Sequence, residues 1–177
     1  MTDTHGLPEL PSGWVVRWLH LIPTGGVVLD VACGTGRHAR VLAARGHEVH
    51  AVDRSEEALA RLAGAPRIIP LCADIEGGPW PYAGRTFSGI VVTNYLHRPL
   101  LPLLVRSLAA PGVLIYETFA VGNERYGRPS NPDFLLRRGE LLDHIRGCLT
   151  VVDYEDLVVS VPRPAVVQRL CATRDRT

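Results

Sequence analysis

Three aspartates stand at or near the ends of successive short apolar runs, and a glycine-rich turn lies between the first two. They are Asp30 in the run 27–31, Asp53 after the run 48–52, and Asp74 after the run 67–72. Carboxylates delivered by neighbouring strands can accept hydrogen bonds from the hydroxyl and amino groups of a nucleoside. In the turn 32–36, two glycines let the backbone approach a ligand without a Cβ clash. The spacing therefore predicts a site for a nucleoside-containing cofactor.

These side chains must be positioned by alternating strands and helices. Residues 27–31 form a β-branched apolar run typical of a strand buried on both faces, and residues 37–45 return to helical spacing. Ser55 favours the start of a helix over 56–63, and Ser12 does the same for a helix over 12–22. The later segments predict strands over 87–92 and 113–117, helices over 100–108 and from 134–136 with 139–145, and a closing hairpin from 149–159 and 166–173. The alternation predicts an α/β fold.

The glycine turn by itself is compatible with two cofactors. Gly34-x-Gly36-x-x-Ala39 also fits the fingerprint of dinucleotide-binding proteins, in which the third glycine can be alanine. Asp30 argues against a dinucleotide because a carboxylate four residues before Gly34 would repel a pyrophosphate, whereas it could hold a cationic ligand. An NAD-dependent oxidoreductase stays open as an alternative.

At this point the chain resembles the class I S-adenosylmethionine-dependent methyltransferases. The acidic position of the family's first motif falls on Asp30, and its glycine positions fall on Ala32, Gly34 and Gly36. Ala32 departs from the family pattern by one methyl group. The resemblance covers roughly residues 25–173 and implies a Rossmann-like methyltransferase fold: a mostly parallel seven-stranded sheet, helices on both faces and an antiparallel C-terminal hairpin. It also implies an N-terminal arm and helix over 1–24 and a single methyltransferase domain over 25–177.

The resemblance implies S-adenosylmethionine as cofactor, S-adenosylhomocysteine as product, and no metal. Asp53 is expected to bind the ribose hydroxyls, Asp74 to accept a hydrogen bond from the adenine amino group, and Ile75 to pack on the adenine ring. The full set of expected cofactor-binding residues is Asp30, Ala32, Cys33, Gly34, Gly36, Asp53, Arg54, Asp74, Ile75 and Asn94. The histidines His38, His47 and His50 show no spacing that suits a metal site.

The methyl acceptor is expected near the ends of the fourth and fifth strands. Residues 93–99 hold His97, a candidate general base because its ordinary pKa lies near neutrality, and Tyr95, a candidate for orienting the acceptor. Residues 118–132 form a long irregular stretch that we interpret as the acceptor-binding loop. Candidate acceptor contacts in and beside it are Glu117, Asn123, Arg125, Tyr126 and Arg128.

Composition limits the classes of protein and of binding partner that fit this sequence. A chain of 177 residues with 46% hydrophobic and 21% charged residues predicts one globular domain, and a net charge of +1 gives no general attraction for nucleic acid. The segment 93–99 also lacks the Asn-Pro-Pro-Tyr or Asp-Pro-Pro-Tyr run of methyltransferases that act on nucleic-acid bases. The four cysteines are expected to be buried and reduced, and no leader or membrane-spanning run is seen, so a cytoplasmic location is expected without a membrane partner. The oligomeric state is left open.

The sequence therefore predicts methyl transfer from S-adenosylmethionine to a small-molecule acceptor. A non-catalytic S-adenosylmethionine-binding regulatory module is a second alternative, because no catalytic base is unmistakable. The glycine loop is also similar to that of small tellurite-resistance methyltransferases, a resemblance that would imply an oxyanion or thiol acceptor.

Overall fold

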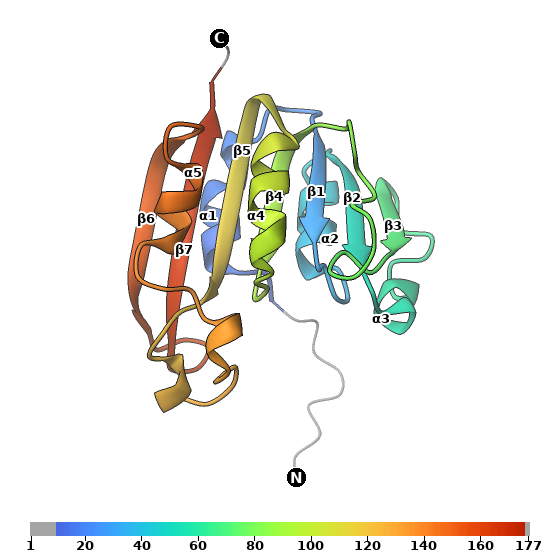
Figure 1. Cartoon of the computed structure of the whole chain (residues 1–177). Coiled ribbons are helices and arrows are strands. Elements are labelled where there is room, and N and C mark those ends of the chain that lie inside the picture. Colours follow the sequence, from blue (N-terminus) through green and yellow to red (C-terminus); the bar gives the residue numbers. More distant parts are fainter. Residues whose placement is uncertain (1–9, 176–177) are drawn as a thin grey trace.

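The computed structural model describes residues 10–175, which build one seven-stranded sheet in the order β3-β2-β1-β4-β5-β7-β6 (Figure 1). The strands are β1 (Val27–Val31), β2 (Glu48–Asp53), β3 (Ile68–Cys72), β4 (Phe87–Thr93), β5 (Leu108–Phe119), β6 (Thr150–Val159) and β7 (Ala165–Arg174). Neighbours are parallel from β3 to β5, and β7 is antiparallel to both β5 and β6. The predicted Rossmann-like α/β fold and its closing hairpin are thereby confirmed.

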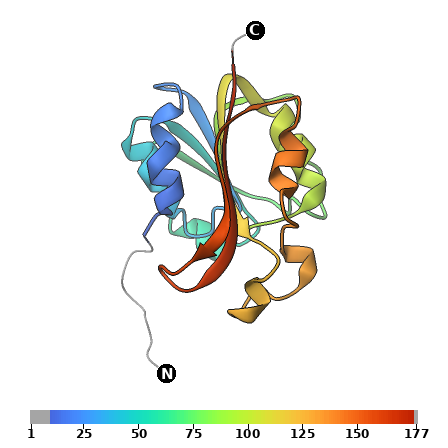
Figure 2. The same cartoon turned by 90° about the vertical axis from the view of Figure 1, so that its left-hand side faces the viewer.

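Helices cover both faces of the sheet, with α1 and α2 on one side and α4 and α5 on the other (Figure 2). The helices are α1 (Gly13–Trp18), α2 (Arg37–Ala44), α3 (Glu56–Ala60), α4 (Leu101–Arg106) and α5 (Glu140–Ile145), joined by 3-10 turns η1 (Leu19–Leu21), η2 (Arg98–Leu100), η3 (Asn123–Arg125) and η4 (Pro132–Phe134). Each face has its own apolar core, one containing Trp14 and Leu42 and the other Leu104 and Leu141. The central strands are buried from both sides, as their continuous apolar runs predict.

The sheet changes direction between β1 and β4. The chain winds outward from β1 through β2 to β3, then returns to place β4 against the other side of β1. Asp30 accordingly lies opposite Ala51 of β2 and Val91 of β4 in the register of the sheet. In open α/β sheets, ligands bind outside the carboxyl ends of the strands at such a switch point.

Three predicted helices are shorter than expected, and α3, predicted over 56–63, ends at Ala60. The N-terminal helix ends at Trp18 and continues as the 3-10 turn η1, and α4 ends at Arg106. Strand β5 then begins at Leu108 instead of Val113, because Leu108 pairs with Phe87 of β4. The register jumps between this pair and the pair Gly89–Val113, so the strand accommodates Pro111 at an irregularity and not in a regular ladder.

The predicted helical turn over 134–136 is wrong. Phe134 ends the 3-10 turn η4, and Leu135 and Leu136 continue as extended chain. Leu136 forms an isolated parallel bridge with Ala120, so pairing to the end of β5 replaces helical hydrogen bonds. Helix α5 starts afresh after Gly139, whose φ of 72° lies in the left-handed region that favours glycine.

The structure can be compared with the predictions made for the cysteines, for membrane-spanning segments and for metal ligands. All four cysteines are free; Cys33 and Cys171 are buried, but Cys72 and Cys148 are exposed, so the expectation that all are buried is wrong. Within residues 10–175, no helix combines the length and apolar character needed to cross a bilayer. The same described part of the chain has no cluster of three or more His, Cys, Asp or Glu side chains suited to a metal ion.

Candidate functional site

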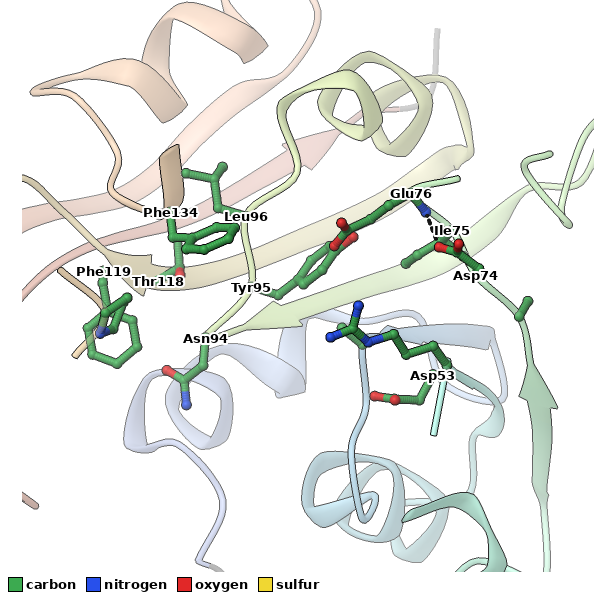
Figure 3. A pocket seen from close by; sticks show the side chains of 14 residues that line it. Asp53, Asp74, Ile75, Glu76, Asn94, Tyr95, Leu96, Thr118, Phe119 and Phe134 are labelled. Carbon is green, nitrogen blue, oxygen red and sulfur yellow. Dashed lines mark hydrogen bonds between the residues drawn. The ribbon is translucent and has the colours of Figure 1, made fainter. Parts of the chain in front are cut away.

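A cavity of about 430 Å³ opens where strands β1 to β5 end (Figure 3). Its lining comes from every one of these strand ends, as the switch-point rule predicts. The lining residues are Ala32, Asp53, Arg54, Ala73, Asp74, Ile75, Glu76, Asn94, Tyr95, Leu96, Thr118, Phe119, Pro129 and Phe134. Six of the ten expected cofactor-binding residues are among them: Ala32, Asp53, Arg54, Asp74, Ile75 and Asn94.

The turn after β1 is a left-handed backbone cradle. Ala32, Gly34 and Gly36 have φ values of 51°, 55° and 79°. A Cβ at Gly36 would collide with the side chain of Leu62, whereas a Cβ at Gly34 would meet no atom within 4 Å and would project into open space. A glycine at that position leaves room for a ligand to approach the backbone. Ala32 tolerates a conformation that is unfavourable for residues with a Cβ.

Asp53 ties the cradle to the end of β2. Its Oδ2 accepts a hydrogen bond from the Gly34 amide at 2.8 Å, and its Oδ1 accepts one from the Ser55 amide at 2.9 Å. The Cys33 amide donates to the Val52 carbonyl at 3.0 Å, a second link between the turn and β2. Each carboxylate oxygen has more than one lone pair, so Asp53 can still accept hydrogen bonds from ligand hydroxyls in the cavity that it lines.

Asp74 and Ile75 follow β3 on the neighbouring wall. Asp74 Oδ1 accepts hydrogen bonds from the Glu76 and Gly77 amides at 2.9 and 3.0 Å. These two bonds lower the pKa of Asp74, which therefore remains an anionic acceptor at neutral pH. Ile75 is buried and offers an apolar surface beside it. This pair has the chemistry that an adenine ring with an amino group requires.

Asp30 lies beneath the cradle and does not line the cavity. It is 1% exposed, and its Oδ2 has no hydrogen-bond partner among the described residues. Burial raises the pKa of Asp30 to about 7, against smaller opposing effects of the Ala39 backbone and Arg37. A buried, unpaired carboxylate is stabilised by a nearby cation. The ammonium group of a methionine-containing ligand in the cradle would supply that cation.

Cys33 contributes to the cradle through its backbone. Its side chain is buried in the apolar core that contains Leu42, and burial raises the pKa of the thiol. The thiol therefore stays protonated and is not exposed to the cavity as a nucleophile.

Of the two candidate catalytic residues, Tyr95 lines the cavity and His97 does not. Figure 3 shows Tyr95 directed toward Glu76 and away from Phe119 and Phe134. Burial, followed by the nearby Glu76 carboxylate, raises the pKa of Tyr95. Their catalytic roles stay predictions.

The five candidate acceptor contacts lie outside the main cavity. Glu117 is buried, where it accepts hydrogen bonds from Ser12 Oγ at 2.8 Å and from Arg169. Asn123 is also buried and donates to the Pro129 carbonyl at 2.9 Å. The remaining three, Arg125, Tyr126 and Arg128, are exposed, and the first two border a separate shallow depression beside Val158. Acceptor contact by these residues stays a prediction.

The structure adds residues that sequence reasoning did not single out. Thr118, Phe119 and Pro129 line the cavity from within the predicted acceptor-binding stretch 118–132, and Leu96 and Phe134 line it from either side of that stretch. Phe134 is 51% exposed although it is a large apolar residue. Its aromatic side chain next to the irregular stretch was the available signal, but a helical interpretation of 134–136 obscured it.

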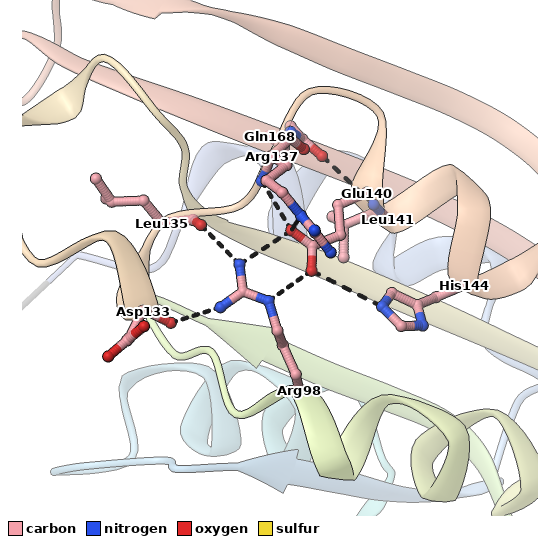
Figure 4. Close-up of polar contacts among 8 residues, drawn as sticks. All are labelled: Arg98, Asp133, Leu135, Arg137, Glu140, Leu141, His144 and Gln168. Carbon is pink, nitrogen blue, oxygen red and sulfur yellow. Dashed lines mark hydrogen bonds and ion pairs between the residues drawn. The ribbon is translucent and has the colours of Figure 1, made fainter.

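An ion pair joins Arg98, at the start of the 3-10 turn η2 that follows β4, to Glu140 of α5 (Figure 4). Arg98 Nε donates to Glu140 Oε1 at 2.6 Å and Arg98 Nη2 to Oε2 at 3.0 Å. The Arg137 amide also donates to Glu140 Oε2, at 2.8 Å. Burial acts to raise the pKa of Glu140, but the hydrogen bonds from Arg98 and Arg137 outweigh it and lower the pKa to about 2. Glu140 is therefore ionised throughout the neutral range.

The site and its fold are matched by known proteins. Residues 28–110 match a family described as methyltransferase domain. TehB from Haemophilus influenzae has a similar structure, with a TM-score of 0.76 and 19% identity over 93% of this chain and 63% of TehB. The chain thus spans less than two thirds of the length of TehB. No curated protein gives a significant sequence match.

Two further structures extend the likeness. A TehB-like methyltransferase from Corynebacterium glutamicum has a TM-score of 0.67 and 18% identity over 92% of this chain and 88% of its own. The 1,6-didemethyltoxoflavin-N1-methyltransferase of Burkholderia thailandensis, with bound S-adenosylhomocysteine, has a TM-score of 0.64 and 20% identity over 92% and 76%. The fold is that of the class I S-adenosylmethionine-dependent methyltransferases. The match over residues 28–110, which covers less than half of the chain, and the shared fold make the chain similar to that family.

Proposed function

We propose that this protein transfers the methyl group of S-adenosylmethionine to a small-molecule acceptor in the cavity at the ends of β1 to β5. The observation that carries the proposal is the convergence of Asp53, Asp74 and the left-handed cradle on one cavity, with buried Asp30 beneath it. Similar structures include a coclaurine N-methyltransferase bound to N-methylheliamine and S-adenosylhomocysteine, and the toxoflavin-pathway enzyme bound to its small acceptor. These relatives support a small molecule over a macromolecule.

The cofactor roles follow from the chemistry of each residue. Asp53 accepts hydrogen bonds from the ribose hydroxyls, Asp74 accepts one from the adenine amino group, and Ile75 packs on the ring. Asp30 balances the ammonium charge of the methionine part through the cradle 32–36. Arg54 and Asn94 border the cofactor from the ends of β2 and β4.

The bound sulfonium supplies an already activated methyl group, so the protein has to align donor and acceptor and exclude water. Orientation of this kind can lower a barrier by roughly 7–11 kcal/mol without a catalytic side chain. Leu96, Phe119 and Phe134 provide the apolar surface that excludes water on the side away from Asp74. Proton removal by His97 is needed only for acceptors that must lose a proton.

Calorimetric titration with S-adenosylhomocysteine tests the cofactor site. The wild-type protein should bind the nucleoside, and Asp53→Ala should weaken binding by about 10-fold to 100-fold because hydrogen bonds to a charged acceptor contribute about 1.5–3 kcal/mol. His97→Ala should leave the affinity within about threefold and lower turnover. Asp143→Ala is the matched control, since Asp143 is exposed on α5 and pairs only with Arg146 among its described neighbours.

The outcomes separate the alternatives. No binding of S-adenosylhomocysteine to the wild type would refute the proposal, and equal losses in Asp53→Ala and His97→Ala would refute the division of roles. A non-catalytic module would bind the nucleoside yet transfer no labelled methyl group from S-adenosylmethionine into a pooled extract of small metabolites.

A further inference from the structure

The cavity has two halves of different chemistry. Its charged lining side chains, Asp53, Arg54, Asp74 and Glu76, come from the ends of β2 and β3. The lining contributed by β4, β5 and the following loop carries no charged side chain; its polar members are Asn94, Tyr95 and Thr118. Figure 3 shows Asp53 and Asp74 on one side of the cavity and Leu96, Phe119 and Phe134 on the other, with Tyr95 directed toward Glu76 between them. We call Leu96, Phe119, Pro129 and Phe134 the apolar wall.

One aromatic ring of the apolar wall, Phe134, is exposed, and the other, Phe119, is half-buried. Phe134 is 51% exposed, whereas Leu96 beside it is 5% exposed. Within residues 10–175, neither Phe119 nor Phe134 forms an aromatic pair with another ring. An exposed phenylalanine on the rim of a cavity gains free energy when an apolar ligand covers it.

Arg98 holds the backbone on both sides of Phe134. Its Nη1 donates to the Asp133 carbonyl and its Nη2 to the Leu135 carbonyl, both at 2.8 Å. The bidentate pair with Glu140 fixes the guanidinium plane, so the two carbonyls are held in one geometry. The Leu136 amide donates to the Phe119 carbonyl at 3.0 Å, which joins the segment of Phe134 to that of Phe119. The wall is therefore built from a rigid scaffold, although it lies on loops.

We propose that the apolar wall is the acceptor subsite, that it selects an uncharged aromatic ring, and that Arg98 is the positioning residue that holds Phe134 against this ring. The proposal rests on the proposed methyltransferase function and names its substrate class. If the acceptor carried a carboxylate, binding against the apolar wall would strip water from that carboxylate. Because this wall offers no cationic partner in return, such an acceptor is disfavoured. A saturated ring system with the same carbon skeleton would lose the aromatic contact with Phe134.

Three matched probes test the substrate class: 2-naphthol, 2-naphthoate and decahydro-2-naphthol. Each is titrated at pH 7.5 into the complex of the protein with S-adenosylhomocysteine, and binding is followed by ligand-observed NMR. We expect 2-naphthol to bind at least about tenfold more tightly than 2-naphthoate. We expect it to bind about threefold to tenfold more tightly than the saturated alcohol, the range given by aromatic pairs.

Variants test the wall and its support. Phe134→Leu should remove the preference for 2-naphthol over decahydro-2-naphthol and leave affinity for S-adenosylhomocysteine within about twofold. Arg98→Lys keeps the charge opposite Glu140 but cannot hold two carbonyls and a carboxylate in one plane, so it should lower the same preference. Val151→Ala, an exposed apolar position on β6, is the control and should change nothing.

A double variant separates positioning from general stability. If Arg98 acts through Phe134, Arg98→Lys should have no further effect on 2-naphthol affinity when Phe134 is already leucine. Equal effects of Arg98→Lys in both backgrounds would overturn the positioning role. Tight binding of 2-naphthoate, or no binding of 2-naphthol while S-adenosylhomocysteine still binds, would overturn the substrate class alone. Failure of S-adenosylhomocysteine to bind would overturn the proposed function as well.

Discussion

Asp30 is a carboxyl group held out of water near the carboxyl end of β1, beside the proposed cofactor site. Because burial raises its pKa to about 7, the folded protein retains a proton there that the unfolded chain, with a pKa near 3.8, has already lost. The contribution of Asp30 to the free energy of unfolding therefore falls as the pH rises from about 4 through 7. A cationic ligand close to Asp30 has the opposite effect, because it stabilises the ionised carboxylate and so lowers the pKa of Asp30.

This linkage predicts a pH-dependent cofactor affinity. Below about pH 7, the dissociation constant of S-adenosylhomocysteine should increase by up to about tenfold per pH unit, since the ligand must then displace the proton from Asp30. Asp30→Asn, which cannot ionise, should bind weakly at every pH and lack this slope. Titrations between pH 5.5 and 8.5 measure both, and parallel pH profiles for the two proteins would exclude Asp30 as the group responsible.

At the scale of elements, Ser12 links the start of α1 to two other elements of the fold. Its Oγ accepts from the Trp14 amide at 3.1 Å and donates to Glu117 Oε1 at 2.8 Å, while its amide donates to His38 Nε2 at 3.0 Å. His38 must be neutral to accept this bond, and burial, followed by the charge of Arg37, lowers the pKa of His38 to about 3. A local helix cap thus also joins α1 to α2 and β5.

Two serine caps in the same chain allow this double role to be measured. Ser55 caps α3 through the Ala58 amide at 3.2 Å and is exposed. Ser55→Ala should lower the free energy of unfolding by about 1 kcal/mol, the usual value of a cap. Ser12→Ala should cost roughly 2–3 kcal/mol, because the buried Glu117 also loses a hydrogen bond. Urea unfolding measures both values, and equal losses would show that the bond to Glu117 contributes nothing.

The elements that sequence patterns predicted well are those defined by local periodicity. Strands β1 to β4 and the closing hairpin fall within one or two residues of the predicted ranges, and Ser12 and Ser55 cap the helices that they were expected to cap. The errors are the ends of the helices predicted over 12–22, 56–63 and 100–108, the start of β5, and the helical turn predicted over 134–136. At the last two places, pairing with distant parts of the chain, Leu108 with Phe87 and Leu136 with Ala120, overrides the helical spacing.

At the scale of the whole molecule, the sheet order assembles a single ligand site from strand ends that are far apart in sequence. Ligand binding at such a site stabilises the entire fold by mass action. The same switch-point geometry serves dinucleotides in other α/β proteins, so the fold alone does not decide the cofactor. We expect Asp30 to favour S-adenosylmethionine because its negative charge beside the glycine turn would repel a pyrophosphate, whereas Asp53 could bind the ribose of either cofactor.

Thermal unfolding distinguishes these cofactors. S-adenosylhomocysteine at 100 times its dissociation constant should stabilise the fold by about 2.7 kcal/mol, which corresponds to a rise in Tm of roughly 5–10 °C for a domain of this size. NAD at the same concentration should leave Tm within about 1 °C. A larger shift with NAD would instead support the oxidoreductase alternative.

By itself, the sequence determined the alternation of strands and helices, the cradle 32–36 and the carboxylates Asp30, Asp53 and Asp74. These features depend on residue type and short spacing along the chain. The tertiary structure alone decided which side chains share the acceptor half of the cavity, and it paired Arg98 with Glu140 and Ser12 with Glu117, 42 and 105 residues apart. Such contacts depend on the order of strands in the sheet, and no local periodicity records that order.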